Sequence, residues 1–159
     1  MSLSLFTTVH VVISLVAICA GFVVAAGMVG SRKLSGLTAF FLVMTALTSG
    51  TGFLFPYKGV TPGIVIGVVS MVVLLLAAVA RYGGNMVGTW RPTWVISAMV
   101  AQYLNFFVFW VQVFDKVPAL HNMASRQKET LFAGAQLASL VAFVLWTVLA
   151  VRRFKPETE

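Results

Sequence analysis

Five uncharged apolar runs dominate this chain of 159 residues. They are residues 9–29, 37–55, 63–80, 94–114 and 130–151, and none contains Asp, Glu, Lys or Arg. At 1.5 Å per residue, these runs of 18 to 22 residues form helices about 27 to 33 Å long, which matches the hydrocarbon core of a bilayer. The runs therefore predict an all-α integral membrane protein, a compact bundle of five transmembrane helices in a single domain that comprises residues 1–159.

The fourth run carries a polar stripe. Gln102, Asn105 and Gln112 recur at helical spacing, so one helix face presents three carboxamides while the other faces are apolar. Because carboxamides are costly against lipid tails, we expect this face to turn toward the other helices or toward a small wet cavity. Thr45 and Thr48 of the second run are expected opposite it, although such hydroxyls also bond their own helix carbonyls.

Aromatic side chains surround the stripe, at Tyr103, Phe106, Phe107, Phe109, Trp110 and Phe114. Aromatic rings beside a few amides are suited to lining a pocket for a flat hydrophobic ligand. The alternative is that these rings are lipid-facing bulk that also anchors the helix at the membrane interface.

A second group of polar residues lies at the span ends on the side that we expect to be outer: His10, Asp115, His121 and Glu129. If these ends meet, His10 and His121 are able to share a metal ion, a b-type haem iron or a proton. The alternative is that His10 hydrogen-bonds a neighbouring helix and His121 is solvated. We expect no resident cofactor, with haem b as the alternative to that expectation.

The sequence lacks the signatures of catalysis and of ion-driven transport. HExxH, GxSxG and Walker patterns are absent, and the single cysteine, Cys19, excludes a CxxC pair and an intrachain disulfide. No charged residue lies within a predicted span, whereas ion-coupled carriers usually place one near the midplane. We therefore expect a protein that is not an enzyme.

Charge is sparse and strongly basic, since eleven Lys and Arg stand against four Asp and Glu. No nucleic-acid motif is present, so we expect no nucleic-acid partner and interpret the charge as a marker of topology. With the N-terminus outside, the inner side holds Arg32, Lys33, Arg81, Arg91, Arg152, Arg153 and Lys155. The outer side then holds Lys58, Lys116, Arg126 and Lys128. The positive-inside rule therefore favours an outer N-terminus and an inner C-terminus.

Local signals predict the connections between the runs. Pro62 suits the first turn of the third helix, and residues 81–92 read as a glycine-rich loop. Residues 115–129 form the longest loop, in which an apolar element predicts a short helix on the membrane surface or capping the bundle. Small residues spaced four apart predict close helix packing in two spans: Ala17, Gly21 and Ala25 in the first, and Gly134, Ala138 and Ala142 in the last.

Two segments of the chain resemble a known group of proteins. GLTAFFLVMTALTSGTGFLFP from Gly36 and QYLNFFVFWVQVFDKVPAL from Gln102 resemble uncharacterised, small, multi-span proteins of bacterial inner membranes. This resemblance implies a multi-pass protein of that membrane and no assigned activity. Leu104, Asn105 and Trp110 are loosely similar to the Leu-Asn and Trp pattern of the tryptophan-rich sensory or translocator proteins, a five-helix family that binds porphyrins and sterols. The Trp-rich segment of this chain, residues 89–94, lies two helices later than that family's Trp-x-Pro-Pro loop.

These observations lead to one expected function and two alternatives. We expect a non-catalytic binding or accessory protein whose polar stripe, with Thr45 and Thr48 opposite, holds a partner helix or a small uncharged ligand. Passive or facilitated movement of a small neutral solute or weak acid along the stripe is the first alternative. Binding of b-type haem or a metal by His10 and His121 is the second. The expected partners are membrane lipids and either a partner subunit or further copies of the chain.

Overall fold

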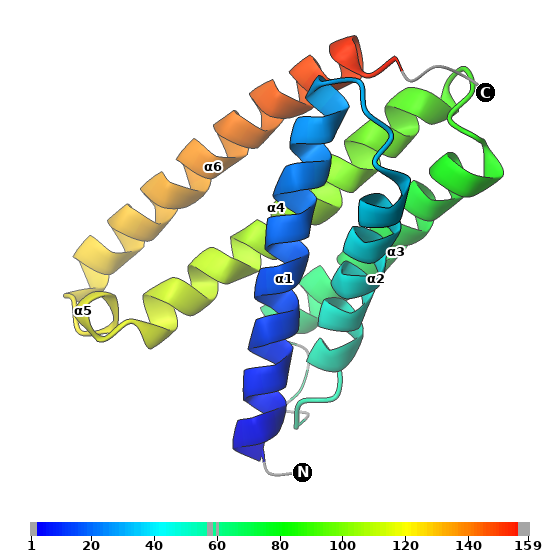
Figure 1. Cartoon of the computed structure of the whole chain (residues 1–159). Coiled ribbons are helices and arrows are strands. Elements are labelled where there is room, and N and C mark those ends of the chain that lie inside the picture. Colours follow the sequence, from blue (N-terminus) through cyan, green and yellow to red (C-terminus); the bar gives the residue numbers. More distant parts are fainter. Residues whose placement is uncertain (1–2, 57–58, 60, 156–159) are drawn as a thin grey trace.

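The computed structural model of the chain describes residues 3–56, 59 and 61–155, and every element assigned in them is helical. In chain order the helices are α1 (Leu3–Val29), α2 (Ser35–Gly52), α3 (Pro62–Ala78), the π-helical turn η1 (Val79–Gly83), α4 (Trp90–Lys116), α5 (Pro118–His121) and α6 (Ser125–Arg153) (Figure 1). Each of the five predicted runs is mainly helical, which confirms the all-α class. The second helix ends at Gly52, three residues before the predicted end at Phe55, and the third run is divided between α3 and η1.

Four of the helices are long and apolar enough to cross a membrane: α1, α3 together with η1, α4 and α6. The shortest of them has 22 residues and so reaches about 33 Å. The helix α2 is not among the four, because its last turns are the polar sequence Thr-Ser-Gly-Thr-Gly, which lowers the mean hydropathy of its 18 residues. These helices indicate a membrane protein with four candidate spans, and α2 is the helix on which a count of five depends.

The long helices run back and forth along the molecule (Figure 1). The helix α2 packs between α1 and α3, α3 packs on α4, and α4 pairs with α6. Toward α5, the α4–α6 pair leans away from α1, so that this hairpin projects from the rest of the molecule (Figure 1). Because the number of long helices is odd, α1 begins at one end of the bundle and α6 ends at the other.

The ends of the helices follow the predicted signals in part. The Thr61 side chain accepts a hydrogen bond from the backbone N–H of Ile64, and Pro62 opens α3 as predicted. The predicted loop 81–92 is wrong at both of its ends, since Arg81 lies in η1 and α4 already begins at Trp90. A proline in the first turn of a helix interrupts no hydrogen bond. Pro92 therefore lies within the first turn of α4, which begins two residues before it. The predicted loop 115–129 is also wrong at both ends, since α4 continues to Lys116 and α6 already begins at Ser125, because hydropathy marks only the apolar part of a helix and not its polar end turns. Between them, the predicted short helix is α5, a single turn.

The core lies where α1 meets α2 and α4. Ala17 and Ala25 of α1 are buried, so the small-residue face predicted for this helix is covered by its neighbours. The large side chains Phe41 of α2 and Trp94 of α4 are also fully buried there. Close approach of α1 to both neighbours therefore positions the polar residues described below.

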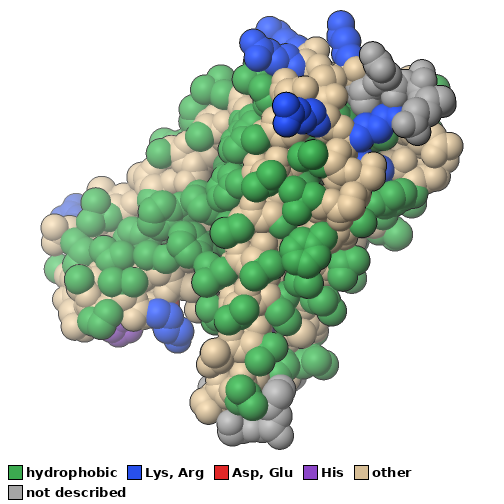
Figure 2. All heavy atoms as spheres, viewed as in Figure 1, with side chains coloured by type: hydrophobic (Ala, Val, Ile, Leu, Met, Phe, Trp, Pro, Cys, Tyr) green, Lys and Arg blue, Asp and Glu red, His purple; other side chains and the backbone are tan. Residues whose placement is uncertain are grey.

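The basic residues separate between the two ends of the bundle. The Arg81 guanidinium donates to the backbone carbonyl of Lys33, and Arg91 donates to the carbonyl of Phe154. The backbone N–H of Lys155 donates to the Ser31 hydroxyl. These contacts bring the ends of α1, α3 and α6 and the start of α4 together, so all seven cations predicted for the inner side share one end, at the top of Figure 2. Lys116, Arg126 and Lys128 lie at the other end, around α5, and Lys58 lies outside the described residues.

Candidate functional site

Gln102 of α4 is the most enclosed carboxamide of the predicted stripe. Its side chain is 1% exposed, and Nε2 donates to the backbone carbonyl of Ile18 in α1 over 2.9 Å. A Cβ atom built on Gly21 would overlap Gln102 Oε1 and lie 2.8 Å from a ring carbon of Phe41. Gly21 therefore leaves the space that the amide occupies, so the small residue of α1 and the polar residue of α4 form one contact.

Asn105 lies one turn further along α4 and reaches α2. Its side chain is 7% exposed, and Nδ2 donates to Thr45 Oγ1 over 3.2 Å. Thr48 instead donates to the carbonyl of Met44 in its own helix, which is the alternative that the sequence left open for these hydroxyls. We call Gln102, Asn105 and Thr45 the polar seam, since these three side chains join α4 to α1 and α2.

Gln112 does not join the polar seam, because its side chain is exposed. It follows Asn105 by seven residues, so helix geometry places both on the same face of α4. At the level of Gln112, however, α4 has already separated from α1 and α2 (Figure 1). The stripe therefore faces the other helices only at Gln102 and Asn105. The described residues do not cover the Gln112 amide.

A second polar contact region lies between α4 and α6. Gln136 is buried and its Nε2 donates to the Phe107 carbonyl over 3.2 Å, while Trp110 Nε1 donates to Ser139 Oγ over 3.0 Å. The carbonyl oxygens of both buried glutamines, Gln102 Oε1 and Gln136 Oε1, lack a hydrogen-bond partner among the described atoms. The seven-residue spacing of the residues that α6 buries, Gln136, Phe143 and Ala150, is the sequence signal that would have identified this contact.

The aromatic residues around the stripe pack mainly on one another. Phe106 contacts the rings of Phe22, Phe143 and Trp110 at centroid distances of 5.5 to 6.0 Å. Aromatic pairs in this range are mutually stabilising. These rings therefore join α1, α4 and α6 to one another, and the two predicted roles, a ligand pocket and lipid-facing bulk, stay predictions.

The two histidines are not brought together. His10 Nδ1 lies 2.7 Å from Thr51 Oγ1, and its imidazole packs edge-on against Phe55, so His10 joins α1 to the end of α2. His121 belongs to α5, at the tip of the hairpin that leans away from α1 (Figure 1). The described residues contain no group of three or more His, Cys, Asp or Glu suited to a metal ion. The structure therefore gives no support to a metal or haem iron shared by His10 and His121, which stays a prediction.

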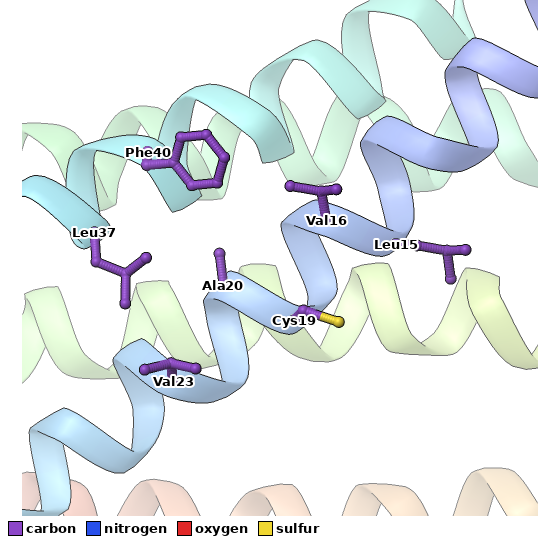
Figure 3. A pocket seen from close by; sticks show the side chains of 7 residues that line it. All are labelled: Leu15, Val16, Cys19, Ala20, Val23, Leu37 and Phe40. Carbon is purple, nitrogen blue, oxygen red and sulfur yellow. The ribbon is translucent and has the colours of Figure 1, made fainter.

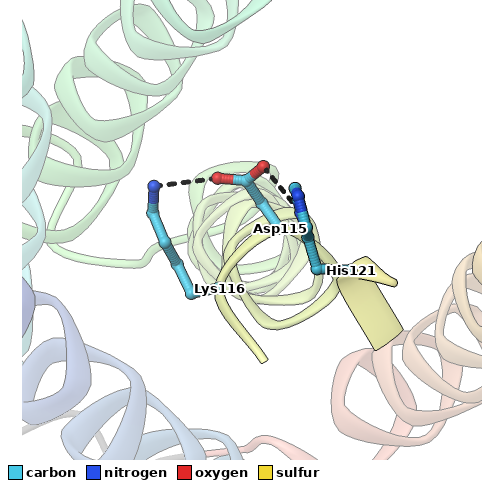
Figure 4. Close-up of polar contacts among 3 residues, drawn as sticks. All are labelled: Asp115, Lys116 and His121. Atoms are coloured by element: carbon cyan, nitrogen blue, oxygen red, sulfur yellow. Dashed lines mark ion pairs between the residues drawn. The ribbon is translucent and has the colours of Figure 1, made fainter. Parts of the chain in front are cut away.

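The other members of the predicted outer-face cluster lie at the surface. The Asp115 carboxylate is 2.9 Å from Lys116 Nζ and 3.9 Å from His121 Nδ1, with one partner on either side (Figure 4). All three side chains are half or more exposed, so these ion pairs add little stability. Glu129, in the first turns of α6, is also exposed. Asp115, His121 and Glu129 therefore form an exposed end of the hairpin, apart from His10.

Arg81 is a buried residue that the sequence reading placed in a loop. Its side chain is 5% exposed, donates to the Lys33 carbonyl over 2.9 Å and stacks over the Trp94 ring at 4.9 Å. No carboxylate among the described residues pairs with it. The signal was its position directly after an apolar run, where a long basic side chain extends toward the membrane surface.

No protein-family model matches the chain, and no curated protein or solved structure is similar to it. The class of protein therefore rests on the fold and on the polar seam. The fold indicates an all-helical membrane protein, and its buried amides join neighbouring helices.

Proposed function

We propose that this protein is a non-catalytic accessory protein of a bacterial inner membrane, and that it holds a membrane helix of a partner against α6. In this proposal all five long helices cross the bilayer, with the N-terminus outside and the C-terminus inside. The polar seam joins the helices of the bundle itself, and the outward face of α6 receives the partner.

Two properties of α2 support a fifth span. It packs between α1 and α3 and runs antiparallel to α1, and its 18 residues reach about 27 Å (Figure 1). Thr48 and Thr51 donate to carbonyls of their own helix, so their hydroxyls do not require water. A short helix with satisfied polar groups is suited to crossing the bilayer between two longer neighbours.

The distribution of charge supports the orientation. Seven of the eleven basic residues share the end at which α1 and α6 finish, and an excess of Lys and Arg marks the cytoplasmic side of membrane proteins. The acids outside the C-terminal tail, Asp115 and Glu129, lie at the opposite end with α5. This asymmetry favours an inner C-terminus.

One observation carries the proposed binding role. Gly134, Ala138 and Ala142, which we call the α6 small-residue face, are all exposed, and a Cβ built on Gly134 meets no atom within 4 Å. The equivalent small residues of α1, Ala17 and Ala25, are buried against neighbouring helices. The same spacing thus receives a helix in one part of the chain and lies open in another. In a bilayer, such faces let helix backbones approach closely, which is a main source of helix association.

The remaining contacts of α6 are consistent with an open face. Along 29 residues, α6 buries only Gln136, Phe143 and Ala150. Ala138 follows Gln136 by two residues and so points about 160° away from it around the helix. The helix therefore presents its buried side to α4 and its small-residue face to the surroundings.

The alternatives predicted from the sequence fit the geometry less well. The polar seam is filled by contacts between its own side chains and the backbone of α1, with Gln102 and Thr45 at most 1% exposed. A path for a neutral solute along these amides would require α1, α2 and α4 to separate. The two histidines lie on different parts of the molecule, which leaves the haem alternative without a pair of ligands.

The proposal is tested by the native mass of the protein after mild detergent extraction from its host membrane. A chain of 17.2 kDa that binds a partner migrates with a larger mass. Ala138→Leu should return it to the mass of a single chain, because the new side chain keeps the two helix backbones apart. Ala133→Leu is the matched control, since Ala133 is also exposed on α6 and points about 140° away from Ala138.

The proposal fails if the wild-type protein is extracted as a single chain, or if Ala138→Leu and Ala133→Leu have the same native mass as the wild type. A mass of two identical chains would replace the separate partner by a second copy, since two small-residue faces pack against each other about a twofold axis.

A further inference from the structure

An apolar groove runs along the surface between α1 and α2. Leu15, Val16, Cys19 and Val23 of α1 form one side, and Leu37 and Phe40 of α2 form the other (Figure 3). The groove has a volume of about 380 Å³ and is lined by apolar side chains, together with the exposed thiol of Cys19. It is separate from the polar seam and from the α6 small-residue face.

The groove leads to the basic turn that joins α1 to α2. Leu37 lies in the first turn of α2, four residues after Lys33. Cys19 lies ten residues before Val29, where α1 ends, which is about 15 Å along the helix. Half of a hydrocarbon core is also about 15 Å thick. Leu15, the lining residue furthest from the turn, lies fourteen residues or about 21 Å before Val29, past the middle of such a core. The groove therefore covers the depth that one lipid acyl chain occupies.

The turn is held in a fixed conformation. The backbone N–H of Arg32 donates to the Gly27 carbonyl over 2.8 Å, and Arg81 donates to the Lys33 carbonyl over 2.9 Å. The N–H of Lys155 donates to the Ser31 hydroxyl, which brings a third basic residue to the turn. The side chains of Arg32 and Lys33 make no ion pair with a carboxylate of the described residues. The turn thus presents unneutralised positive charge at the end of an apolar groove.

We propose that one anionic phospholipid binds at this site, with an acyl chain in the groove between α1 and α2 and its phosphate paired with Arg32 and Lys33. A phosphate accepts charge-assisted hydrogen bonds from both side chains. A zwitterionic lipid carries a cation of its own beside the phosphate, which these basic residues repel. Charge and groove together therefore select a lipid with a net negative headgroup.

The test is native mass spectrometry of the purified full chain with phosphatidylglycerol or with phosphatidylcholine of the same acyl composition. We expect one retained phosphatidylglycerol, bound about tenfold more tightly than phosphatidylcholine, since each nearby basic residue favours anionic lipid. The double variant Arg32→Gln/Lys33→Gln should lose this preference and still leave the Lys33 carbonyl available to Arg81. Cys19→Phe, which fills the groove, should weaken retention of the lipid at unchanged charge.

Two control variants match these changes. Lys116→Gln/Arg126→Gln removes the same charge at the opposite end, and Val72→Phe places the same ring on an exposed site of α3 outside the groove. Both should retain phosphatidylglycerol as the wild type does. Equal retention of the two lipids by the wild type would overturn the proposal, as would an equal loss of retention in test and control variants. Displacement of the lipid by millimolar inorganic phosphate, with Cys19→Phe without effect, would also overturn it and assign the turn to a free anion.

Discussion

Gln102 and Gly21 show how one polar residue determines the packing of two membrane helices. In hydrocarbon the carboxamide requires a partner within the protein, and it finds one in the Ile18 carbonyl of α1. The amide reaches that carbonyl only because Gly21 has no side chain. The stabilisation from this contact therefore depends on both residues together. A substitution of either residue alone leaves the other poorly packed.

Gly21→Ala should destabilise the protein by about 1 to 3 kcal/mol, because the added methyl group overpacks against the Gln102 amide and the Phe41 ring. The free energy of unfolding, measured by titration with a denaturing detergent in mixed micelles, checks this value. Gly50→Ala is the control, since a Cβ there meets no atom within 4 Å and the change should be neutral or stabilising by up to about 1 kcal/mol. Gln102→Ala should recover part of the loss in the Gly21→Ala background. Equal effects at Gly21 and Gly50 would show that the two helices do not approach as described.

The C-terminal end of α6 is joined to two other parts of the bundle. Phe154, directly after the helix, is 1% exposed, and its carbonyl accepts a hydrogen bond from Arg91 of α4 over 2.6 Å. The next residue, Lys155, donates its N–H to Ser31 in the turn after α1. These contacts join α6 to α4 and to the turn after α1, whereas near its start α6 packs on α4, with Phe132 against Phe114. The burial of Phe154 should therefore contribute more to stability than any single residue along the open side of α6.

Phe154→Ala is expected to lower the free energy of unfolding by about 3 kcal/mol, because it removes a fully buried ring and leaves a cavity. Leu145→Ala serves as the comparison, since Leu145 is 66% exposed on the same helix and its truncation should change stability by less than about 0.5 kcal/mol. Both values come from the same micelle titration. A smaller loss for Phe154→Ala than for Leu145→Ala would contradict the anchoring role of the helix end.

The contrast between Gln102 and Gln112 shows what the sequence predicts and where its information ends. Helical periodicity places Gln102, Asn105 and Gln112 on nearly the same face of α4, and hydropathy places the helix itself. Whether a residue on that face is covered depends on how far α1 and α2 accompany α4, which is set by the angles at which the packed helices cross. Crossing angles arise from side-chain packing between distant segments, so no local pattern distinguishes the buried Gln102 from the exposed Gln112.

Arg81 illustrates the same limit for charge. Its place after an apolar run predicts a position at the membrane surface, and the structure does place it at one end of the bundle. Its burial against Trp94 and the Lys33 carbonyl requires three separate segments to meet at one point. The sequence therefore predicts on which end the arginine lies, while the partners that enclose it follow from tertiary structure.

The whole molecule has an odd number of long helices and an uneven distribution of charge, and these two properties together predict its orientation. If α2 crosses the bilayer, the start of α1 and the end of α6 lie on opposite sides. If α2 does not cross, both lie on the same side. Because seven basic residues gather where α1 and α6 end, the positive-inside rule then assigns that end to the cytoplasm.

Single cysteines in a Cys19→Ala background test this topology by labelling intact spheroplasts with a membrane-impermeant maleimide. Leu3→Cys and Asn122→Cys should react from outside, because they lie at the start of α1 and in the loop between α5 and α6. Lys155→Cys should react only after the membrane is permeabilised. Val72→Cys, in an exposed position halfway along α3, should stay unlabelled in both conditions, since lipid covers it and a thiol there does not meet water. Labelling of Leu3→Cys and Lys155→Cys from the same side would mean an even number of crossings, and α2 would then be the helix that does not cross.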